Sequence, residues 1–501
     1  MALVPGLGSW PARRARITPE ATALVDTGGA LTYAQLADRA ARLAGALRRL
    51  GVARGDRVAH LGVNAVSTFE TFFATWLLGA IAVPLNHRLA GPEIGYMLAD
   101  SEAALLLHTD PELVEAAGPA VPAIDISAGV DALLSIEPGG DPDIGLDDPA
   151  ILLYTSGTTG RPKAAVLTHG NLTWNTVNQL AHVDVLSTDR ALCIAPLFHC
   201  VGLGQVTLPT LFKGGSVEPL AKFDAGTVLD RIGAAGVTSF SAVPTMLQMM
   251  VEHPAWESAE LGSLRTVLYG GSPVQERVAR AWLDRGVRLQ QGYGMTEASP
   301  GVYMVPRDGG SVPIVPDRPV SVGVPHFFTE VAQLRDGAPA PIGTEPAELL
   351  VRGPHVFAGY WNRPEETAAA HVDGWFRTGD VLRVGADGWA DVVDRVKDVI
   401  ISGGENVYPA EVEAVLVQLD TIAAAAVVGV PDERWGEVGV AFLQPRTGTG
   451  LDVDEVREHL AAHLARFKIP KHLVVVDELP RNATGKIRRV ELRQRAAEGV
   501  R

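Results

Sequence analysis

The stretch Tyr154-Thr-Ser-Gly-Thr-Thr-Gly-Arg-Pro-Lys163 carries the sharpest local signal in the chain. It follows the apolar residues Ala150 to Leu153, which have the character of a strand. Glycines let backbone N–H groups approach phosphate oxygens, hydroxyls donate further hydrogen bonds, and a lysine adds positive charge. The stretch therefore predicts a phosphate-binding loop, with a Ser/Thr-rich surface loop as the alternative. It differs from the pattern G-x-x-x-x-G-K-[ST], because Gly157 and Gly160 are too close and no Ser or Thr follows Lys163.

On both sides of this loop, helical and strand patterns alternate. Apolar residues recur at helical spacing from Tyr33 to Leu47, and Arg57 to Leu61 has the pattern of a strand. The same order returns in residues 227–242 and 274–290, whereas Ser311 to Pro325 has the composition of an irregular connection. The alternation predicts a mixed α/β (α+β) protein whose sheets are flanked by helices.

Composition narrows the class of protein. The chain has 501 residues, a formal net charge of −15 and 47% hydrophobic residues, which is typical of a globular protein with a large core. The acidic balance argues against a nucleic-acid partner. Cys193 and Cys200 are too few for a disulfide framework and fit a reducing compartment. The most apolar window, Phe72 to Leu85, is too short to cross a bilayer, and the first residues lack a signal peptide. We expect a cytoplasmic protein without an integral membrane segment.

The last part of the chain has the pattern of a separate, smaller domain. After the charged run Asp394-Arg-Val-Lys-Asp398, residues 411–419 and 453–464 have helical patterns and residues 423–430 a strand pattern. We therefore expect a large N-terminal domain, residues 1–396, and a small C-terminal α+β domain, residues 397–501. The tail is locally basic, which suits either a solvated surface or a mobile lid over anionic substrates.

Further motifs follow the phosphate-binding stretch in a characteristic order. They are Pro196-Leu-Phe-His-Cys-Val-Gly202, Tyr269-Gly-Gly-Ser-Pro273, Gln291-Gly-Tyr-Gly-Met-Thr-Glu297, Trp375-Phe-Arg-Thr-Gly-Asp380 and Pro480-Arg-Asn-Ala-Thr-Gly-Lys486. Together with Tyr154 to Lys163, they resemble the motifs of the acyl-adenylate-forming superfamily over roughly residues 10–497. The nearest resemblance is to bacterial fatty-acyl-CoA ligases and 4-coumarate-type CoA ligases. It implies ATP, Mg²⁺ and CoA as cofactors, and a small carboxylic acid as substrate.

The resemblance assigns roles in the first half-reaction, in which a carboxylate attacks the α-phosphate of ATP. Tyr293 is expected to pack on adenine, Thr296 to bind the α-phosphate, and Glu297, with Thr155, to hold Mg²⁺. The full nucleotide-binding set that the resemblance implies is Thr155, Ser156, Gly157, Thr158, Thr159, Lys163, Gly271, Ser272, Pro273, Gln291, Gly292, Tyr293, Gly294, Met295, Thr296, Asp380, Arg395 and Lys486.

The resemblance also assigns charged residues to ribose binding and to catalysis. An ionised Asp380 has two acceptor oxygens for the two ribose hydroxyls, and Arg395 resembles the second ribose contact of the family. Lys486 resembles the lysine that neutralises charge in the adenylation transition state. With Thr296 and His199, it forms the expected catalytic set.

The second half-reaction, attack of the CoA thiol on acyl-AMP, is expected to use a rotated lid. Lys397 matches the hinge position of the family, and rotation there would withdraw Lys486. The same rotation would present the segment Ser402, Gly403, Gly404 and Glu405 to the pantetheine chain, with the glycines permitting close approach.

Three segments are expected to form the acyl pocket, and none of them contains Lys or Arg: His199 to Gln205, Ser239 to Leu247 and Ala298 to Tyr303. The expected pocket residues are His199, Gly202, Ser239, Gly270, Gly294, Pro300 and Gly301. A second carboxylate would stay unpaired there, and glycines leave room. We therefore expect a hydrophobic monocarboxylic acid: a medium or long fatty acid first, and a bulky natural-product acid second.

Other activities are compatible with the same motifs. An acyl-AMP ligase would load a carrier protein in place of CoA, a non-catalytic binding protein would lack both half-reactions, and a luciferase would need a special substrate. A carrier protein and a second copy of the chain stay open as partners.

Overall fold

The computed structural model describes residues 6–26, 28–140, 143–155, 162–271, 274–306, 321–402, 405–432, 435–448, 450–482 and 486–499. The chain forms two compact units. The first comprises Met1–Val331 and Val351–Phe376, and the second Ala332–Leu350 and Arg377–Arg501.

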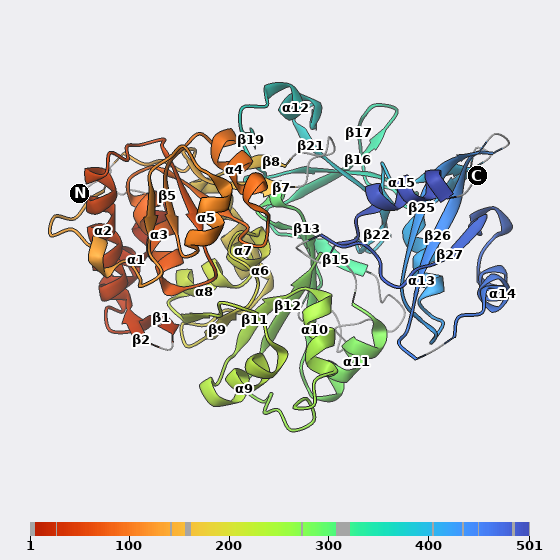
Figure 1. Ribbon diagram of the computed structural model, residues 1–501, viewed down its shortest axis with the longest axis horizontal. Helices are drawn as coiled ribbons and strands as arrows, with labels where there is room; N and C mark the ends of the chain where they lie inside the picture. Colours follow the sequence, from red (N-terminus) through yellow and green to blue (C-terminus); the bar gives the residue numbers. More distant parts are fainter. Residues whose placement is uncertain are drawn as a thin grey trace. The chain divides into compact units, whose positions relative to one another are not determined.

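One sheet of the first unit has seven strands (Figure 1). Their order is β19 (Gly359–Tyr360), β8 (Lys163–Thr168), β7 (Pro149–Thr155), β4 (Ile81–Leu85), β3 (Arg57–Leu61), β5 (Ala103–His108) and β6 (Ala123–Asp125). The central strands are parallel and almost wholly apolar, as expected for strands buried on both faces. Strands β7 and β8 are instead antiparallel, so the chain reverses direction between them.

The other sheet strands of the first unit follow one another in a second series. Their order is β2 (Gly29–Thr32), β1 (Thr22–Asp26), β10 (Ser216–Pro219), β9 (Arg190–Cys193), β11 (Ser239–Ala242), β12 (Thr266–Gly270), β13 (Leu289–Gly294), β14 (Gly301–Met304) and β15 (Ser321–Pro325). Strands β9 to β13 run parallel, so the carboxyl ends of β12 and β13 meet at one edge. This edge is where ligands bind in α/β sheets.

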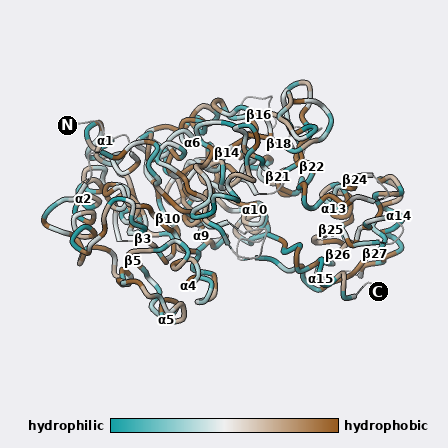
Figure 2. Tube along the Cα trace, turned by 90° about the horizontal axis from the view of Figure 1, so that it is seen from above, coloured by the Kyte–Doolittle hydropathy of each residue, from teal (hydrophilic) through white to brown (hydrophobic). Residues whose placement is uncertain are grey.

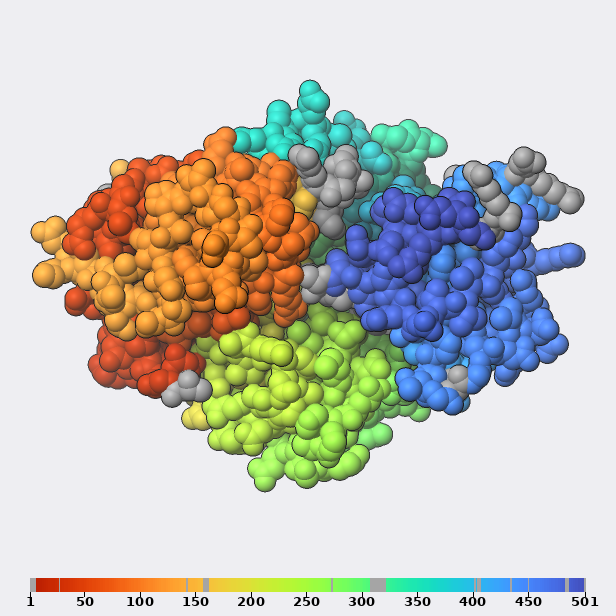
Figure 3. Space-filling view, in the orientation of Figure 1, coloured from red at the N-terminus to blue at the C-terminus, as the bar shows by residue number. Residues whose placement is uncertain are grey.

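Helices surround these sheets. They are α1 (Trp10–Ile17), α2 (Tyr33–Arg49), α3 (Val66–Leu77), α4 (Gly91–Asp100), α5 (Pro111–Ala117), α6 (His169–His182), α7 (Cys200–Gly204), α8 (Thr207–Lys213), α9 (Ala225–Ala235), α10 (Pro244–Val251), α11 (Glu276–Asp284) and α12 (Pro364–Ala369). In Figure 3 the red and orange N-terminal residues and the yellow-green residues around 220–290 form two visibly distinct lobes of this unit.

Local sequence explains where several helices begin. Thr32 accepts a hydrogen bond from the backbone of Gln35, whose side chain accepts one from the backbone of Thr32. Thr168 and Asn171 repeat this capping box at α6. Each box satisfies two backbone N–H groups that a helix start leaves without an intrahelical partner.

The second unit contains two groups of strands. The first has the order β17 (Ala338–Ala340), β16 (Glu330–Arg335), β18 (Ala347–Arg352), β21 (Trp375–Val384) and β22 (Ala390–Arg395). The second has the order β24 (Glu405–Val407), β23 (Ile400–Ser402), β26 (Gly436–Pro445) and β25 (Ile422–Asp432), with β27 (His472–Val475) also paired to β26. Helices α13 (Pro409–Leu416), α14 (Val453–His463) and α15 (Arg489–Gly499) pack on the second group.

The predicted α/β class and the smaller C-terminal α+β domain are confirmed. The helix from Tyr33 and the strand Arg57–Leu61 lie where their patterns placed them. The expectation of an irregular connection through Pro325 is wrong at its end, because residues 321–325 pair with β14 as β15. The second compact unit begins its last segment at Arg377 and also includes Ala332–Leu350. The domain boundary and hinge at Lys397 stay a prediction.

Hydrophilic and hydrophobic stretches are interspersed along the coloured part of the trace (Figure 2). Over the described part of the chain, no helix has both the length and the apolar character needed to span a bilayer.

The buried His169 makes the stability of the first unit sensitive to acid. Its ring is fully buried, and Nδ1 accepts a hydrogen bond of 3.1 Å from the Leu7 backbone. Burial lowers the pKa of His169 to about 4. The folded chain therefore resists protonation that the unfolded chain accepts near pH 6.5, and stability is lost as the pH falls through this range.

We expect His169→Asn to weaken this pH dependence. Urea unfolding followed by tryptophan fluorescence should show that the fall in unfolding free energy between pH 7 and pH 5 is about 2 kcal/mol smaller in the variant. His463→Asn, at an exposed histidine of α14, is the control. An identical fall in wild type and His169→Asn would contradict the assignment.

Candidate active site

The phosphate-binding stretch begins and ends in adjacent antiparallel strands. Thr155 at the end of β7 is the register partner of Lys163 at the start of β8, and its hydroxyl lies 3.4 Å from the Lys163 carbonyl oxygen. Of the predicted residues, Ser156, Gly157, Thr158 and Thr159 lie outside the described residues. The two flanking strands place Thr155 and Lys163 side by side.

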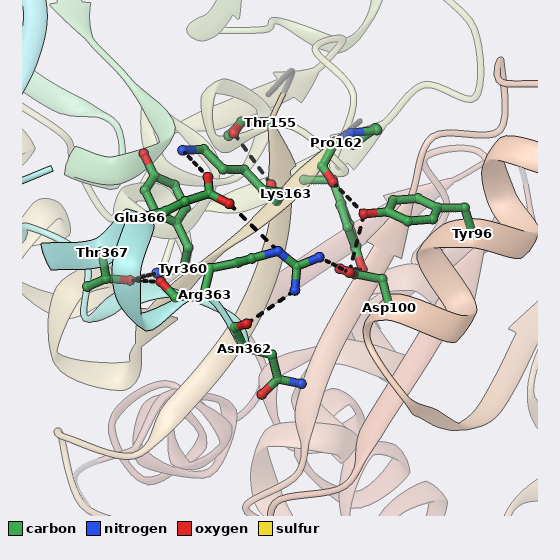
Figure 4. A network of polar contacts seen from close by, with 11 residues as sticks. Tyr96, Asp100, Thr155, Pro162, Lys163, Tyr360, Asn362, Arg363, Glu366 and Thr367 are labelled. Carbon is green, nitrogen blue, oxygen red and sulfur yellow. Dashed lines mark hydrogen bonds and ion pairs between the residues drawn. The ribbon is translucent and has the colours of Figure 1, made fainter. Parts of the chain in front are cut away.

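Helix α4 holds both flanks of this stretch (Figure 4). The Tyr154 hydroxyl donates to Asp100 at 3.0 Å, and the Tyr96 hydroxyl lies 3.1 Å from the Pro162 carbonyl oxygen. The Asp100 side chain is only 8% exposed, and it also accepts a 2.6 Å hydrogen bond from Arg363. A buried carboxylate needs such a partner, so Arg363 stabilises the whole arrangement.

The Lys163 ammonium has two partners, one in β19 and one in α12. It lies 3.5 Å from the centre of the Tyr360 ring and 3.1 Å from a Glu366 carboxylate oxygen. The Tyr360 hydroxyl donates a 2.8 Å hydrogen bond to Glu297. The predicted phosphate-binding lysine and magnesium-binding glutamate therefore meet the same aromatic residue.

The motif from Gln291 to Glu297 leaves β13 at the ligand-binding edge. Gln291 is buried and accepts a hydrogen bond from the Tyr269 hydroxyl at 2.9 Å. The half-buried Tyr293 meets Tyr303 edge to face, with 6.2 Å between ring centres. Beyond Gly294 and Met295, Thr296 begins a short 3₁₀ helix. This order places an aromatic ring, a hydroxyl and a carboxylate at one strand end.

Three residues of the expected nucleotide-binding set, Gly271, Ser272 and Pro273, follow β12. Gly271 is exposed and has a φ of +92°, in the region that favours glycine. Ser272 and Pro273 lie outside the described residues.

His199 lies at the end of a turn that Asn64 organises. The buried Asn64 amide donates to the carbonyls of Cys193 and Ala195 and accepts from the Leu197 backbone at 2.9 Å. His199 then precedes α7, and Cys200 lies between two predicted catalytic side chains. Its sulfur is 3.9 Å from His199 Nδ1 and 3.6 Å from the Thr296 hydroxyl. The structure thus brings His199 and Thr296 to one place.

The glycines expected to leave room in the acyl pocket are packed closely. A Cβ on Gly202 would overlap the Pro196 carbonyl oxygen, and one on Gly294 would overlap the Pro300 carbonyl oxygen. A Cβ on Gly301 would lie 2.7 Å from the His326 ring. At these positions, the close approach of neighbouring atoms already excludes a side chain. The other expected pocket residues, Ser239 and Pro300, are buried.

A buried glutamine covers the glycine pair at the ends of β12 and β13. Gly270 and Gly292 are register partners, and a Cβ on either would lie 3.3 Å from the Gln205 amide nitrogen. Gln205 is 6% exposed, and its carbonyl oxygen has no hydrogen-bond partner among the described residues. A buried polar atom without a partner is costly, so this oxygen is suited to a ligand donor.

The donors near Glu297 suit a magnesium ion bound together with phosphates. Among the described residues there is no group of three or more His, Cys, Asp and Glu side chains that could form a metal site. Mg²⁺ commonly takes one or two protein carboxylates and completes its shell with phosphates and water. The Glu297 carboxylate has a second oxygen beside the one that accepts from Tyr360, and the Thr155 hydroxyl is another oxygen donor.

The second unit carries the predicted ribose contacts. Asp380 and Arg395 are register partners on β21 and β22, and their side chains form an ion pair of 3.2 Å. Asp380 is buried whereas Arg395 is half exposed. This pairing fixes the direction of the Asp380 carboxylate.

Arg493 of α15 contacts the predicted hinge and the residue after it. Arg493 donates to the Lys397 carbonyl at 3.2 Å and to the Asp398 carboxylate at 2.6 Å. Burial raises the pKa of Asp394 to about 6, although it accepts hydrogen bonds from the Arg395 and Ala410 backbones. The Lys397 side chain itself is exposed.

The predicted thioester segment and the predicted catalytic lysine lie at two other places in this unit. Ser402 and Glu405 are register partners of β23 and β24, and Gly403 and Gly404 lie outside the described residues. The Asn482 side chain accepts a hydrogen bond of 2.9 Å from the Lys486 backbone, and Lys486 is exposed.

Sequence reasoning missed the residues that support the site. Asp100, Tyr360, Arg363 and Glu366 stand outside the motifs quoted above. Gln205 ends one of the presumptive pocket segments, but no role was assigned to it. The acidic and aromatic composition of residues 359–367 was the one available signal.

Comparison with known proteins identifies the family of this chain. Residues 11–361 match the family model of the AMP-binding enzyme, and residues 411–486 match that of the AMP-binding enzyme C-terminal domain. A feruloyl-CoA synthase from Amycolatopsis sp is 52% identical over 498 residues, which cover 98% of this chain and 99% of that protein. An indoleacetate–CoA ligase from Aromatoleum aromaticum is 41% identical over 511 residues, covering 98% of each.

Solved structures agree as well. The o-succinylbenzoate CoA synthetase of Bacillus subtilis, in complex with its acyl-adenylate intermediate, is 34% identical, covers 97% of each chain and superposes with a TM-score of 0.87. The same synthetase has also been solved with ATP and a magnesium ion. The resemblance found in the motifs is therefore confirmed, and the chain belongs to the AMP-binding enzymes of the acyl-adenylate-forming superfamily.

Proposed function

We propose that the acid activated by this AMP-forming acid–CoA ligase is a ring-hydroxylated aromatic monocarboxylic acid of hydroxycinnamate size. Gln205 carries the proposal. Its buried carbonyl oxygen, above Gly270 and Gly292, would accept a hydrogen bond from a ring hydroxyl. A fatty acyl chain offers no donor and would leave this oxygen unsatisfied, which costs about 1–3 kcal/mol.

The relatives support an aromatic acid over a fatty acid. The two curated relatives described above are named for feruloyl and indoleacetate substrates, both of which contain aromatic rings. Of the two classes expected from the sequence, the proposal therefore takes the bulky natural-product acid. The expected absence of Lys and Arg in the pocket segments also suits an uncharged ring.

The half-reactions follow from the proposed residue roles. Lys163 and Lys486 would neutralise phosphate charge during adenylation, and Thr296 would bind the α-phosphate. ATP would be held at Tyr293 and Asp380, and Mg²⁺ at Glu297. A rotation about Lys397 would then exchange Lys486 for the Ser402–Glu405 turn, so that CoA could attack acyl-AMP.

The substrate class is tested with a panel of acids, ATP and CoA, with products read by mass spectrometry. Ferulate and 4-hydroxycinnamate should give the highest kcat/KM, ahead of cinnamate, indole-3-acetate and C8–C16 fatty acids, with acetate and malonate inactive. Highest kcat/KM for a fatty acid would contradict the proposal. Pyrophosphate exchange without acyl-CoA would point to a carrier protein as acceptor.

Gln205→Leu should reduce the preference for a hydroxylated ring. The ratio of kcat/KM for 4-hydroxycinnamate over cinnamate should fall about 10-fold or more, as for the loss of one buried hydrogen bond. Gln290→Leu removes another buried glutamine, one that donates to the Val305 carbonyl, and serves as control for destabilisation alone. An unchanged ratio in Gln205→Leu would refute the role of this amide.

Lys486→Ala should separate the half-reactions. Acyl-AMP formation, measured by pyrophosphate exchange, should fall by roughly 10²–10³-fold or more, because one charge contact to the transition state is lost. Conversion of supplied acyl-AMP and CoA to acyl-CoA should continue near the wild-type rate. Lys471→Ala, a half-exposed lysine of the same unit, should affect neither. Equal loss of both half-reactions in Lys486→Ala would contradict domain alternation.

A further inference from the structure

Tyr360 contacts both charged groups that the proposed function assigns to magnesium pyrophosphate. Its ring face lies 3.5 Å from the Lys163 ammonium, and its hydroxyl donates to a Glu297 oxygen at 2.8 Å. The side chain is 9% exposed. One rigid ring therefore separates an ammonium from a carboxylate by a fixed distance.

The backbone of Tyr360 is held as firmly as its side chain. Tyr360 pairs with Ala165 in β8, so it is attached to the strand that starts at Lys163. Its backbone N–H also donates to the Thr367 hydroxyl at 2.9 Å, as Figure 4 shows. Strand β8 and Thr367 thus both fix the backbone position of Tyr360, and with it the position of the ring.

A chain of alternating charges completes the surroundings of Lys163. Glu366 accepts from Lys163 and lies 3.8 Å from Arg363, which donates to Asp100. In Figure 4 the Glu366 carboxylate lies between the Lys163 ammonium and the Arg363 guanidinium. Lys163 is therefore restrained on one side by a ring and on the other by a carboxylate, which a polyphosphate could replace.

The phenol acts as a donor throughout the physiological range. A phenol hydroxyl is protonated at neutral pH and donates one hydrogen bond, here to Glu297. The hydroxyl therefore keeps its proton and directs one Glu297 oxygen toward itself, leaving the other oxygen for a cation.

We propose that Tyr360 is a positioning residue for adenylation: it sets the spacing between Lys163 and Glu297 so that a polyphosphate and its divalent cation fit together. The inference rests on the proposed roles of Lys163 and Glu297. It concerns only the half-reaction in which pyrophosphate is present, because the attack of CoA on acyl-AMP uses neither the β- and γ-phosphates nor their cation.

Tyr360 also packs against Phe357, with 4.9 Å between ring centres, so the test must separate positioning from packing. Tyr360→Phe retains the ring on Lys163 and Phe357 and removes the hydroxyl alone. Tyr360→Leu removes both contacts. Tyr33→Phe is the matched control, because its buried hydroxyl lies close to the Leu211 and Gly215 carbonyls in another part of the first unit.

Cation binding is measured by electron paramagnetic resonance of Mn²⁺ titrated into the full-length protein with the unreactive analogue α,β-methylene-ATP. In Tyr360→Phe, the Mn²⁺ dissociation constant should rise about 10-fold, because a hydrogen bond to a charged carboxylate is lost. Binding of the analogue without metal, followed by calorimetry, should stay within about 2-fold. In Tyr360→Leu, metal-free analogue binding should also weaken, by about 5-fold, as the cation–π contact is lost.

Kinetics provide the second measurement. In Tyr360→Phe, the Mg²⁺ concentration that gives half-maximal pyrophosphate exchange should rise about 10-fold, while thioester formation from supplied acyl-AMP stays at the wild-type rate. Tyr33→Phe should lower the melting temperature and leave both measurements unchanged.

Wild-type Mn²⁺ affinity in Tyr360→Phe would overturn the inference, and so would equal loss of both half-reactions, which would reduce Tyr360 to a packing residue. If the wild-type protein exchanges pyrophosphate with none of the acids, the proposed substrate class fails, whereas the Mn²⁺ titration still decides the role of Tyr360.

Discussion

A loop that binds a polyphosphate through its own backbone cannot use the same groups to stabilise itself, so neighbouring elements must hold its ends. For the predicted phosphate-binding stretch, the largely buried Asp100 side chain meets that constraint. It accepts from Tyr154 before the loop, while Tyr96 of the same helix reaches Pro162 after it. Arg363, distant in sequence, pairs with the Asp100 charge. Without that guanidinium, a carboxylate in this position would be too costly to bury.

The elements that depend on local pattern could be predicted from the sequence. The helix from Tyr33 has a capping box at its start, and the strand Arg57–Leu61 is apolar enough to be buried. Motif residues such as Thr155 and Lys163, or Asp380 and Arg395, were predicted to act at one ligand and are register partners in adjacent strands. In each of these cases, the deciding information lies within a few residues or in a motif.

The supporting residues could not be predicted, because each depends on a partner far along the chain. Tyr360 gains its importance from Glu297 and Lys163, and Arg363 from Asp100. The pocket glycines illustrate a second limit. Composition shows that Gly202 and Gly301 lack side chains, but the space beside them is already occupied by Pro196 and His326. Whether a missing side chain creates room or permits close packing depends on backbone direction, which emerges only in the fold.

The second unit places a constraint on any rotation at Lys397. Arg493 of α15 binds both the carbonyl of Lys397 and the carboxylate of Asp398. A change in the backbone dihedrals at Lys397 turns its carbonyl, so this hydrogen bond must break or Arg493 must follow. The shared contact with Asp398 favours the second course, because a side chain held by an ion pair can move with the segment it binds. Arg493 would then keep its contacts with Lys397 and Asp398 during the rotation.

The two sheets of the first unit contribute different chemistry. The sheet containing β7, β8 and β19 supplies Lys163 and the predicted phosphate-binding stretch. In the other sheet, the ends of β12 and β13 lie beside the Gln205 amide, and β13 leads to Thr296 and Glu297. Adenylation needs an acid and a nucleotide in one place, so the two sheets must be held in a fixed position relative to each other. The hydrogen bond from Tyr360 to Glu297 joins them directly, at the point where phosphate and cation would meet. A small error in that contact would separate the charges on which in-line attack depends, even if each sheet were folded correctly.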